Sequence, residues 1–189
     1  MKQFLFALLV LCAIPAFTYA DDAKPEEKKD EKKPAAEVAD YKKLKEALPA
    51  KFGGLDRSAI TGQRTKQAEI SMATAEAKYG KDEGDAPKLL TINVIDYAGM
   101  AGWAEGMAMW EKMDMDQEGD EGYTKTETIN GRKLMLTYQT NDKHGTIQLL
   151  INKRLLVNIE ARNVSGDDLK ALAKEFDATK LAEAAPEAK

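Results

Sequence analysis

Residues 123–162 read YTKTETINGRKLMLTYQTNDKHGTIQLLINKRLLVNIEAR, and this stretch decides the fold. Asn130-Gly131 separates two runs rich in strand-forming residues, Tyr123–Ile129 and Arg132–Gln139. A two-residue type I′ turn requires positive φ at both central positions, which Asn tolerates and Gly adopts freely. The pattern therefore predicts a β-hairpin at the start of the stretch.

Two further strands follow, at Thr146–Ile151 and Arg154–Arg162, and the last three of the four strands alternate apolar with polar residues. The apolar positions that share one face are Leu134, Leu136, Tyr138, Ile147, Leu149, Ile151, Leu155, Val157, Ile159 and Ala161. Such alternation is typical of an antiparallel sheet with one face against a core.

The first strand fits this alternation less well. A two-residue turn would place Glu127 opposite Leu134 and Lys125 opposite Leu136, so that charges fall on the apolar face. Either the turn is longer than two residues, or the strand is an edge whose inward charges discourage aggregation.

Two more strands and three helices complete the expected fold. The strands are Gln67–Tyr79 and Leu89–Tyr97, and the helices are Val38–Leu48, Ala98–Met113 and Ser165–Phe176. The alanines of the first of these strands also suit a helix, but a turn-rich segment and a clear strand follow it, which favours a strand. We therefore expect an α+β fold, a single antiparallel sheet of about six strands covered by two or three helices.

Four segments divide the chain. Lys2, an apolar run and small residues before Asp21 predict a cleaved signal peptide at residues 1–20. A charged, disordered linker is expected at residues 21–39, a single α+β domain at 40–181 and a disordered tail at 182–189. The predicted location is periplasmic or secreted, with no stable membrane insertion after signal cleavage.

Composition narrows the classes of partner and chemistry. Cys12, the only cysteine, lies in the predicted signal peptide, so the mature chain should have no disulfide and no thiolate chemistry. The formal net charge of −4, with signs interspersed, gives no reason to expect nucleic acid as a partner. No cofactor is expected.

Methionines in and after the second predicted helix are a candidate copper site. Met107, Met109 and Met113 are the proposed ligands, because thioethers are soft and suit Cu(I) where thiols are lacking. The alternative is that methionines and tryptophans at helical spacing, among them Trp103 and Trp110, form part of the core.

The acidic segment 114–121 is a candidate calcium site. Asp114, Asp116 and Glu118 alternate like the opening of a calcium-binding loop, and Gly119 follows them. Lys125 stands where such a loop needs a bidentate carboxylate. The alternative is therefore a solvated acidic loop.

Catalytic motifs are sparse. His144 is the only histidine, and the three serines lie outside any nucleophile-elbow pattern. The sequence has no phosphate-binding loop, dinucleotide-binding glycine pattern or zinc-ligand spacing. We therefore expect a protein without catalytic activity.

Four motifs are spread along the chain: Leu48-Pro49 with Phe52-Gly53-Gly54-Leu55, then Ile92–Gly99, Gly122–Thr126 and Asn163-Val164-Ser165. With them, most of Leu48–Leu181 resembles a group of uncharacterised bacterial envelope proteins. More loosely, the Asn130-Gly131 hairpin through Ile159, followed by a helix, is similar to PsbP-like domains. That resemblance implies a curved antiparallel sheet flanked by helices and a non-catalytic accessory or binding role.

The leading hypothesis is an exported soluble binding or accessory protein whose partner is a protein or a small molecule. A periplasmic metal-binding protein, with copper at the methionines or calcium at residues 114–121, is the alternative. Met135, Leu150 and Leu156 are apolar residues on the polar face, and they suggest a homodimer as a third hypothesis.

Overall fold

The computed structural model describes residues 37–187 except 69 and 101, and it leaves out the side chains of residues 104, 105, 107 and 108. The predicted signal peptide and nearly all of the predicted linker lie outside the described residues. The strands are β1 (Lys51–Phe52), β2 (Leu55–Gln67), β3 (Ile70–Tyr79), β4 (Leu89–Gly99), β5 (Asp116–Gly119), β6 (Gly122–Ile129), β7 (Arg132–Gln139), β8 (His144–Ile151) and β9 (Leu155–Arg162). The helices are α1 (Tyr41–Ala47), α2 (Trp103–Lys112), α3 (Gly166–Glu175) and α4 (Thr179–Ala184).

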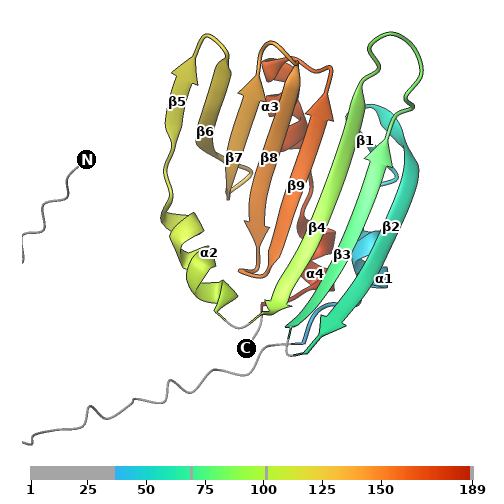
Figure 1. Ribbon diagram of the computed structural model, residues 1–189, viewed down its shortest axis with the longest axis vertical. Helices are drawn as coiled ribbons and strands as arrows, with labels where there is room; N and C mark the ends of the chain where they lie inside the picture. The colour runs from blue at the N-terminus through green and yellow to red at the C-terminus, as the bar shows by residue number, and fades with distance from the viewer. Residues whose placement is uncertain (1–36, 69, 101, 188–189) are drawn as a thin grey trace, which may run out of the picture. The chain divides into compact units, whose positions relative to one another are not determined.

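All nine strands form one sheet in the order β1-β2-β3-β4-β9-β8-β7-β6-β5, and every neighbouring pair is antiparallel (Figure 1). The sheet consists of two meanders, β1–β4 and β5–β9. The connection through α2 carries the chain from β4 to the far edge at β5, and the second meander then returns until β9 pairs with β4. The middle of the sheet therefore joins segments that lie more than fifty residues apart in the sequence.

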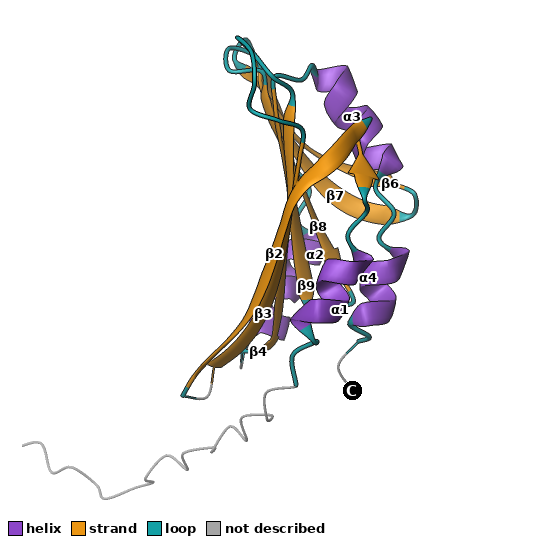
Figure 2. Cartoon of the chain, turned by 90° about the vertical axis from the view of Figure 1, so that its right-hand side faces the viewer, coloured by secondary structure: helices purple, strands orange, loops and turns teal. Residues whose placement is uncertain are grey.

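The helices divide between the two faces of the sheet. Helices α1, α3 and α4 cover one face, which we call the inner face (Figure 2). Helix α2 lies on the opposite side, the outer face, at the ends of β4 and β7 (Figure 1). There Trp103 stacks on Tyr97 of β4, and Lys133 Nζ of β7 donates to the Glu111 carbonyl.

The core is continuous along the inner face. Leu136, Ile147, Val157, Ile92 and Ala75 lie on five strands, and each is almost completely buried. Alternation along each strand turns these residues toward the helices and their neighbours toward the outer face. The expected apolar face is thus confirmed for the last three strands of the opening stretch.

Small residues on β2 and β3 let α1 lie close to the sheet. Ala73, Ala75 and Ala77 are the buried positions of β3, and a Cβ added at Gly62 of β2 would lie 2.8 Å from Cδ of Lys45 in α1. The alanines that made this segment ambiguous in sequence are therefore the strand positions that face a helix.

The expected sheet of about six strands under two or three helices is wrong. About half of the described residues lie in strands and about a fifth in helices, in nine strands and a few short helices. The strands that were not predicted are β1, β2 and β5. β2 lies near an edge and is polar on both faces, so it shows no hydrophobic alternation. β5 has only exposed residues, and its acidic sequence predicts a loop instead of a strand.

The hairpin turn has two residues, as predicted. Ile129 pairs with Arg132, and Asn130 and Gly131 both have positive φ, 52° and 73°. Lys125 and Glu127 therefore do face the inner side, opposite Leu136 and Leu134. The edge of the sheet is β5 and not β6, and Lys125 forms ion pairs with Asp116 and Glu118 of that edge strand.

The end of the described chain is held against the fold. α4 covers residues 179–184, where a last contact and then a tail were expected, and Ala178, Leu181 and Ala185 are completely buried. Asn152 Nδ2 donates to the carbonyls of Ala182 and Ala185.

None of the helices in the described part of the chain has the length and apolar character needed to cross a membrane.

Candidate functional site

Two hollows lie in line on the outer face, over β2, β3 and β4. The lower hollow has a volume of about 320 Å³, and its lining side chains are Thr61, Gln63, Thr74, Glu76, Asn93 and Ile95. The upper hollow has about 310 Å³, and the side chains from the strands and from the β3–β4 loop that line it include Ser58, Lys78, Asp82, Leu89, Thr91, Glu160 and Arg162. We call the two hollows together the outer groove.

Strand geometry explains why these side chains gather. Ala73, Ala75 and Ala77 face the core, so Thr74, Glu76 and Lys78 between them face outward. Cross-strand pairing sets Asn93 beside Glu76, and Asn158 of β9 beside Asn93. Glu76 and Lys78 form an ion pair of 3.5 Å at the boundary between the two hollows.

Two amide oxygens on this face are unpaired. The Oδ1 atoms of Asn93 and Asn158 are shielded from solvent and accept no hydrogen bond from any described residue. A buried acceptor without a donor costs about 1–3 kcal/mol. Because χ2 of Asn is soft and roughly two-fold, the amide of Asn93, which lines the lower hollow, can rotate and present its oxygen to a donor there. This part of the face therefore favours a molecule that donates hydrogen bonds.

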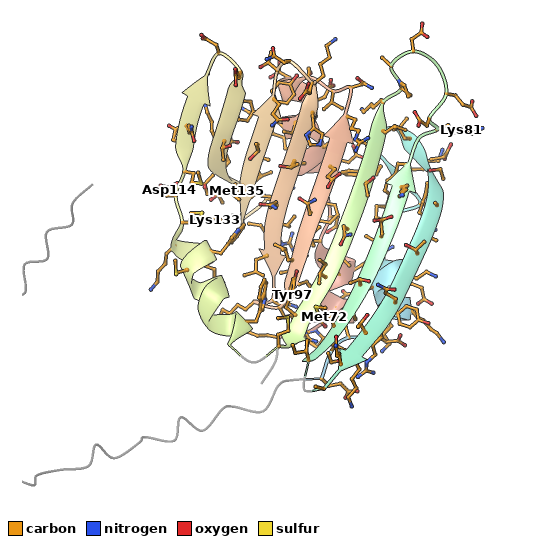
Figure 3. The ribbon with its side chains drawn as sticks, in the orientation of Figure 1. Met72, Lys81, Tyr97, Asp114, Lys133 and Met135 are labelled. Atoms are coloured by element: carbon orange, nitrogen blue, oxygen red, sulfur yellow. The ribbon has the colours of Figure 1, made fainter. Side chains whose placement is uncertain are left out.

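The lower end of the groove is bounded by aromatic residues. Tyr97 follows the groove residue Ile95 on the outer face of β4, with Met72 of β3 near it (Figure 3). The Tyr97 ring stacks on Trp103 of α2 at 3.8 Å between centroids and 21° between planes. The first turn of α2 is thereby fixed at this end of the groove.

The predicted copper ligands lie on and after α2. Met109 is 73% exposed and Met113 is 39% exposed, while the side chain of Met107 lies outside the described residues. The alternative interpretation is that methionines and tryptophans of this helix form part of the core. It does not hold for Met109 and Met113, because both side chains are exposed. Copper binding by the three thioethers stays a prediction.

Two of the three predicted calcium ligands form ion pairs with a lysine side chain. Asp116 and Glu118 lie on β5 and both pair with Lys125 of β6. The hydrogen bond from Lys125 lowers the pKa of Glu118, and the same bond raises the pKa of Lys125. Asp114 lies before the strand, near the end of α2 (Figure 3).

Within the described residues, no group of three or more His, Cys, Asp or Glu side chains is placed to hold a metal ion. The structure thus brings Asp116 and Glu118 together around Lys125 and does not gather the full predicted set. Calcium binding by this segment also stays a prediction.

The candidate catalytic residues lie apart from one another in the fold. His144 begins β8 on the outer face, where its cross-strand partners are Gln139 and Arg162. The Ser58 hydroxyl donates to the Lys78 carbonyl on β3, and Ser165 caps α3 in a capping box with Asp168. Two of the three serines thus have structural partners of their own.

The apolar residues proposed for a homodimer are also on the outer face. Leu150 and Leu156 are cross-strand neighbours, and Ile95 extends their row onto β4. All three side chains are half-buried, as is Met135 on β7. Leu150 and Leu156 adjoin on this face, whereas the cross-strand partner of Met135 is the polar Gln148, and use of these residues in a dimer stays a prediction.

The groove itself was not predicted. The signal in the sequence is a polar residue at every second position of two neighbouring strands, Thr74, Glu76 and Lys78 on one and Thr91 and Asn93 on the other. That period predicts an outward row. It does not reveal that β9 pairs with β4 and adds Glu160 and Arg162.

No family model, curated protein or solved structure matches the chain.

Proposed function

We propose that the chain is an exported binding protein without catalytic activity of its own, and that its ligand is an elongated, uncharged, hydroxyl-rich chain, a glycan, that lies in the outer groove. The observation that carries this proposal is the groove lining, which consists of hydroxyls, amides and paired charges around two hollows in line along β3.

The charges of the groove favour an uncharged ligand. Glu76 and Lys78 neutralise each other, and the upper hollow carries both Asp82 and Glu160 as well as Arg162. A ligand with one strong charge would meet repulsion at one part of the groove for every attraction at another. A neutral ligand with many hydroxyl groups can donate to the Asn93 oxygen and accept from the threonine hydroxyls of the groove.

The shape of the groove favours a chain. The hollows run beside β3 from Thr74 to Gly80, a distance of about 20 Å at the rise of an extended strand. Leu89 and Ile95 offer small apolar surfaces for the C–H faces of sugar rings, one in each hollow. Under the groove, β3 and β4 are paired on both sides, so recognition over these two strands has to come from side chains.

NMR titration of the mature protein with soluble neutral oligosaccharides tests the proposal. A panel of β-linked N-acetylglucosamine, β-linked glucose and α-linked glucose oligomers, with a sulfated oligomer as the charged comparison, covers the main chemistries. We expect at least one neutral oligomer to shift the amides of β3 and β4, and the sulfated oligomer to bind more weakly. Amide shifts that occur only on other elements, or with none of the neutral oligomers, would overturn the proposal.

A matched pair of variants locates the binding. Asn93→Ala removes one groove amide, and a lost hydrogen bond should weaken binding about three- to tenfold. Thr137→Val on β7 is the control, because it lies on the same face outside the groove and keeps the shape of the side chain. Equal affinities of the two variants would contradict binding in the groove.

A further inference from the structure

One buried ion pair lies directly behind the lower end of the outer groove. Asp96 of β4 is 0% exposed and Arg154, at the turn before β9, is 6% exposed. The guanidinium donates twice to the carboxylate, from Nε to Oδ1 at 3.1 Å and from Nη2 to Oδ2 at 2.6 Å. Such a bidentate pair has a fixed geometry.

The same two side chains hold both ends of the described chain. Arg154 Nη2 donates to the Glu37 carbonyl at 2.9 Å, and Nη1 donates to the Pro186 carbonyl at 2.9 Å. Asp96 Oδ2 accepts from the Ala39 backbone N–H at 2.7 Å. We call Asp96 and Arg154, with these three bonds, the clasp.

The clasp is also bonded to the segment that leads into α2. Asp96 Oδ1 accepts from the Ala98 N–H at 3.0 Å, and the Tyr97 N–H donates to the Arg154 carbonyl at 3.0 Å. Tyr97 in turn carries the stack with Trp103. The indole N–H of Trp103 is buried and has no hydrogen-bond partner among the described residues, so no hydrogen bond there holds the ring in addition to the stack.

We propose that the clasp couples the chain ends to α2, so that withdrawing either end loosens the Tyr97–Trp103 stack. A buried guanidinium that loses a carbonyl acceptor is left with an unpaired charged donor, which is costly. The ion pair then has to shift toward new partners or water. Asp96 cannot shift without disturbing its bonds to Ala98 and, through Arg154, to Tyr97.

Regulation of ligand binding follows if the outer groove is the binding site, and this part rests on the proposed function. Tyr97 follows the lining residue Ile95 on the same face of β4, so a loosened stack moves the side chain next beyond the lower hollow. A partner that holds or pulls either chain end would thereby change the affinity of the groove. The coupling itself requires no ligand.

Tryptophan signals test the coupling, because both tryptophans of the chain, Trp103 and Trp110, lie in α2. The test variant is the mature chain without residues 186–189, which loses the Pro186 acceptor but keeps the bonds from Asn152 to α4. We expect a red-shifted tryptophan emission and a loss of near-UV circular dichroism, with unchanged far-UV circular dichroism. Arg154→Lys, which keeps the charge but not the forked geometry, should change both signals in the same direction.

Lys153→Ala is the matched control, since it removes the exposed 3.0 Å ion pair with Glu187 beside the clasp and leaves the clasp intact. Its tryptophan signals should equal those of the unmodified chain.

Unchanged tryptophan signals in the truncated chain, with faster hydrogen exchange only at residues 37–39, would overturn the coupling. If the signals change but the affinity for a bound oligosaccharide does not, the coupling stands and the regulatory part is wrong. Failure of all oligosaccharides to bind would affect the proposed function alone.

Discussion

The inner and outer faces of the sheet come from the same strands but follow different physical rules. On β4, Leu90, Ile92 and Val94 are buried under helices, while Thr91 and Asn93 between them line the outer groove. The inner face supplies the apolar burial that stabilises the fold. The outer face is therefore free to carry hydroxyls, amides and unpaired acceptors that add little to stability.

The largest difference between the faces is expected for neighbouring substitutions on β4. Ile92→Ala leaves a cavity in the inner face and should lower the free energy of unfolding by about 2–5 kcal/mol. Asn93→Ala on the outer face removes a buried acceptor that has no donor, so it should leave the free energy of unfolding unchanged or raise it, by up to about 1–3 kcal/mol. Urea denaturation measures both free energies of unfolding, and the two variants should share the same dependence on urea concentration. Similar losses for both substitutions would mean that the outer face also stabilises the fold.

High pH should act on the inner face through Tyr79. This side chain is 1% exposed and donates to the Pro49 carbonyl at 2.9 Å, and burial raises its pKa from about 10 to about 12. Between these two values the unfolded chain loses the phenolic proton and the folded chain keeps it. Stability from this group is therefore complete below pH 10 and is lost as the pH rises through about 12, with a total of about 3 kcal/mol.

Denaturation midpoints at pH 9 and at pH 11.5 measure this loss. Tyr79→Phe should be less stable at pH 9, because the Pro49 carbonyl loses its donor, and its further decline at high pH should be smaller. Tyr41→Phe on α1 is the matched control and should decline as the unmodified chain does. Identical declines in all three proteins would show that Tyr79 ionises freely in the folded state.

The two faces also differ in how well they can be predicted from sequence. Period-two alternation identified the inner face of β7, β8 and β9, and Asn130-Gly131 identified the hairpin and its register. The inward position of Lys125 and Glu127 was one of two alternatives, and it is correct. β2 was missed because polar residues on both faces of an edge-proximal strand produce no hydrophobic period.

The outer groove depends on pairings that local patterns do not contain. Asn93 and Asn158 become neighbours only because β9 returns to β4 across the whole second meander. The clasp is similar, since Arg154 reaches Glu37 and Pro186 across long sequence separations. The methionines of α2 were visible in sequence, but the exposure of Met109 follows from a helix that lies on the less covered face.

A smaller effect is expected at the helix that covers β7 and β8 on the inner face. Ser165 Oγ accepts from the Asp168 N–H, and the Asp168 carboxylate accepts from the Ser165 N–H, which lowers the pKa of Asp168. Ser165→Ala removes the cap of α3 and should cost about 1 kcal/mol. Ser58→Ala on the outer side of β2 is the control, with a smaller expected loss. A loss at Ser58 as large as that at Ser165 would contradict the contrast between the faces.

The smallest effect on stability is expected where the inner face meets the edge strand, because the inner face carries a charged residue there. Lys125 faces inward, but its ion pairs with Asp116 and Glu118 are largely exposed, and such pairs contribute only about 0–1 kcal/mol. Lys125→Leu should therefore change the free energy of unfolding by less than about 1 kcal/mol.

The same substitution should nevertheless extend the apolar face to β5, whose outer edge has no partner among the described strands. Inward charges near an edge oppose pairing with another chain, so we expect concentration-dependent association of Lys125→Leu in light scattering. Thr126→Leu, the adjacent outer-face change, is the control and should stay closer to the unmodified chain. If Lys125→Leu stays monomeric at high concentration, the inward charges serve only the local ion pairs and do not protect the edge.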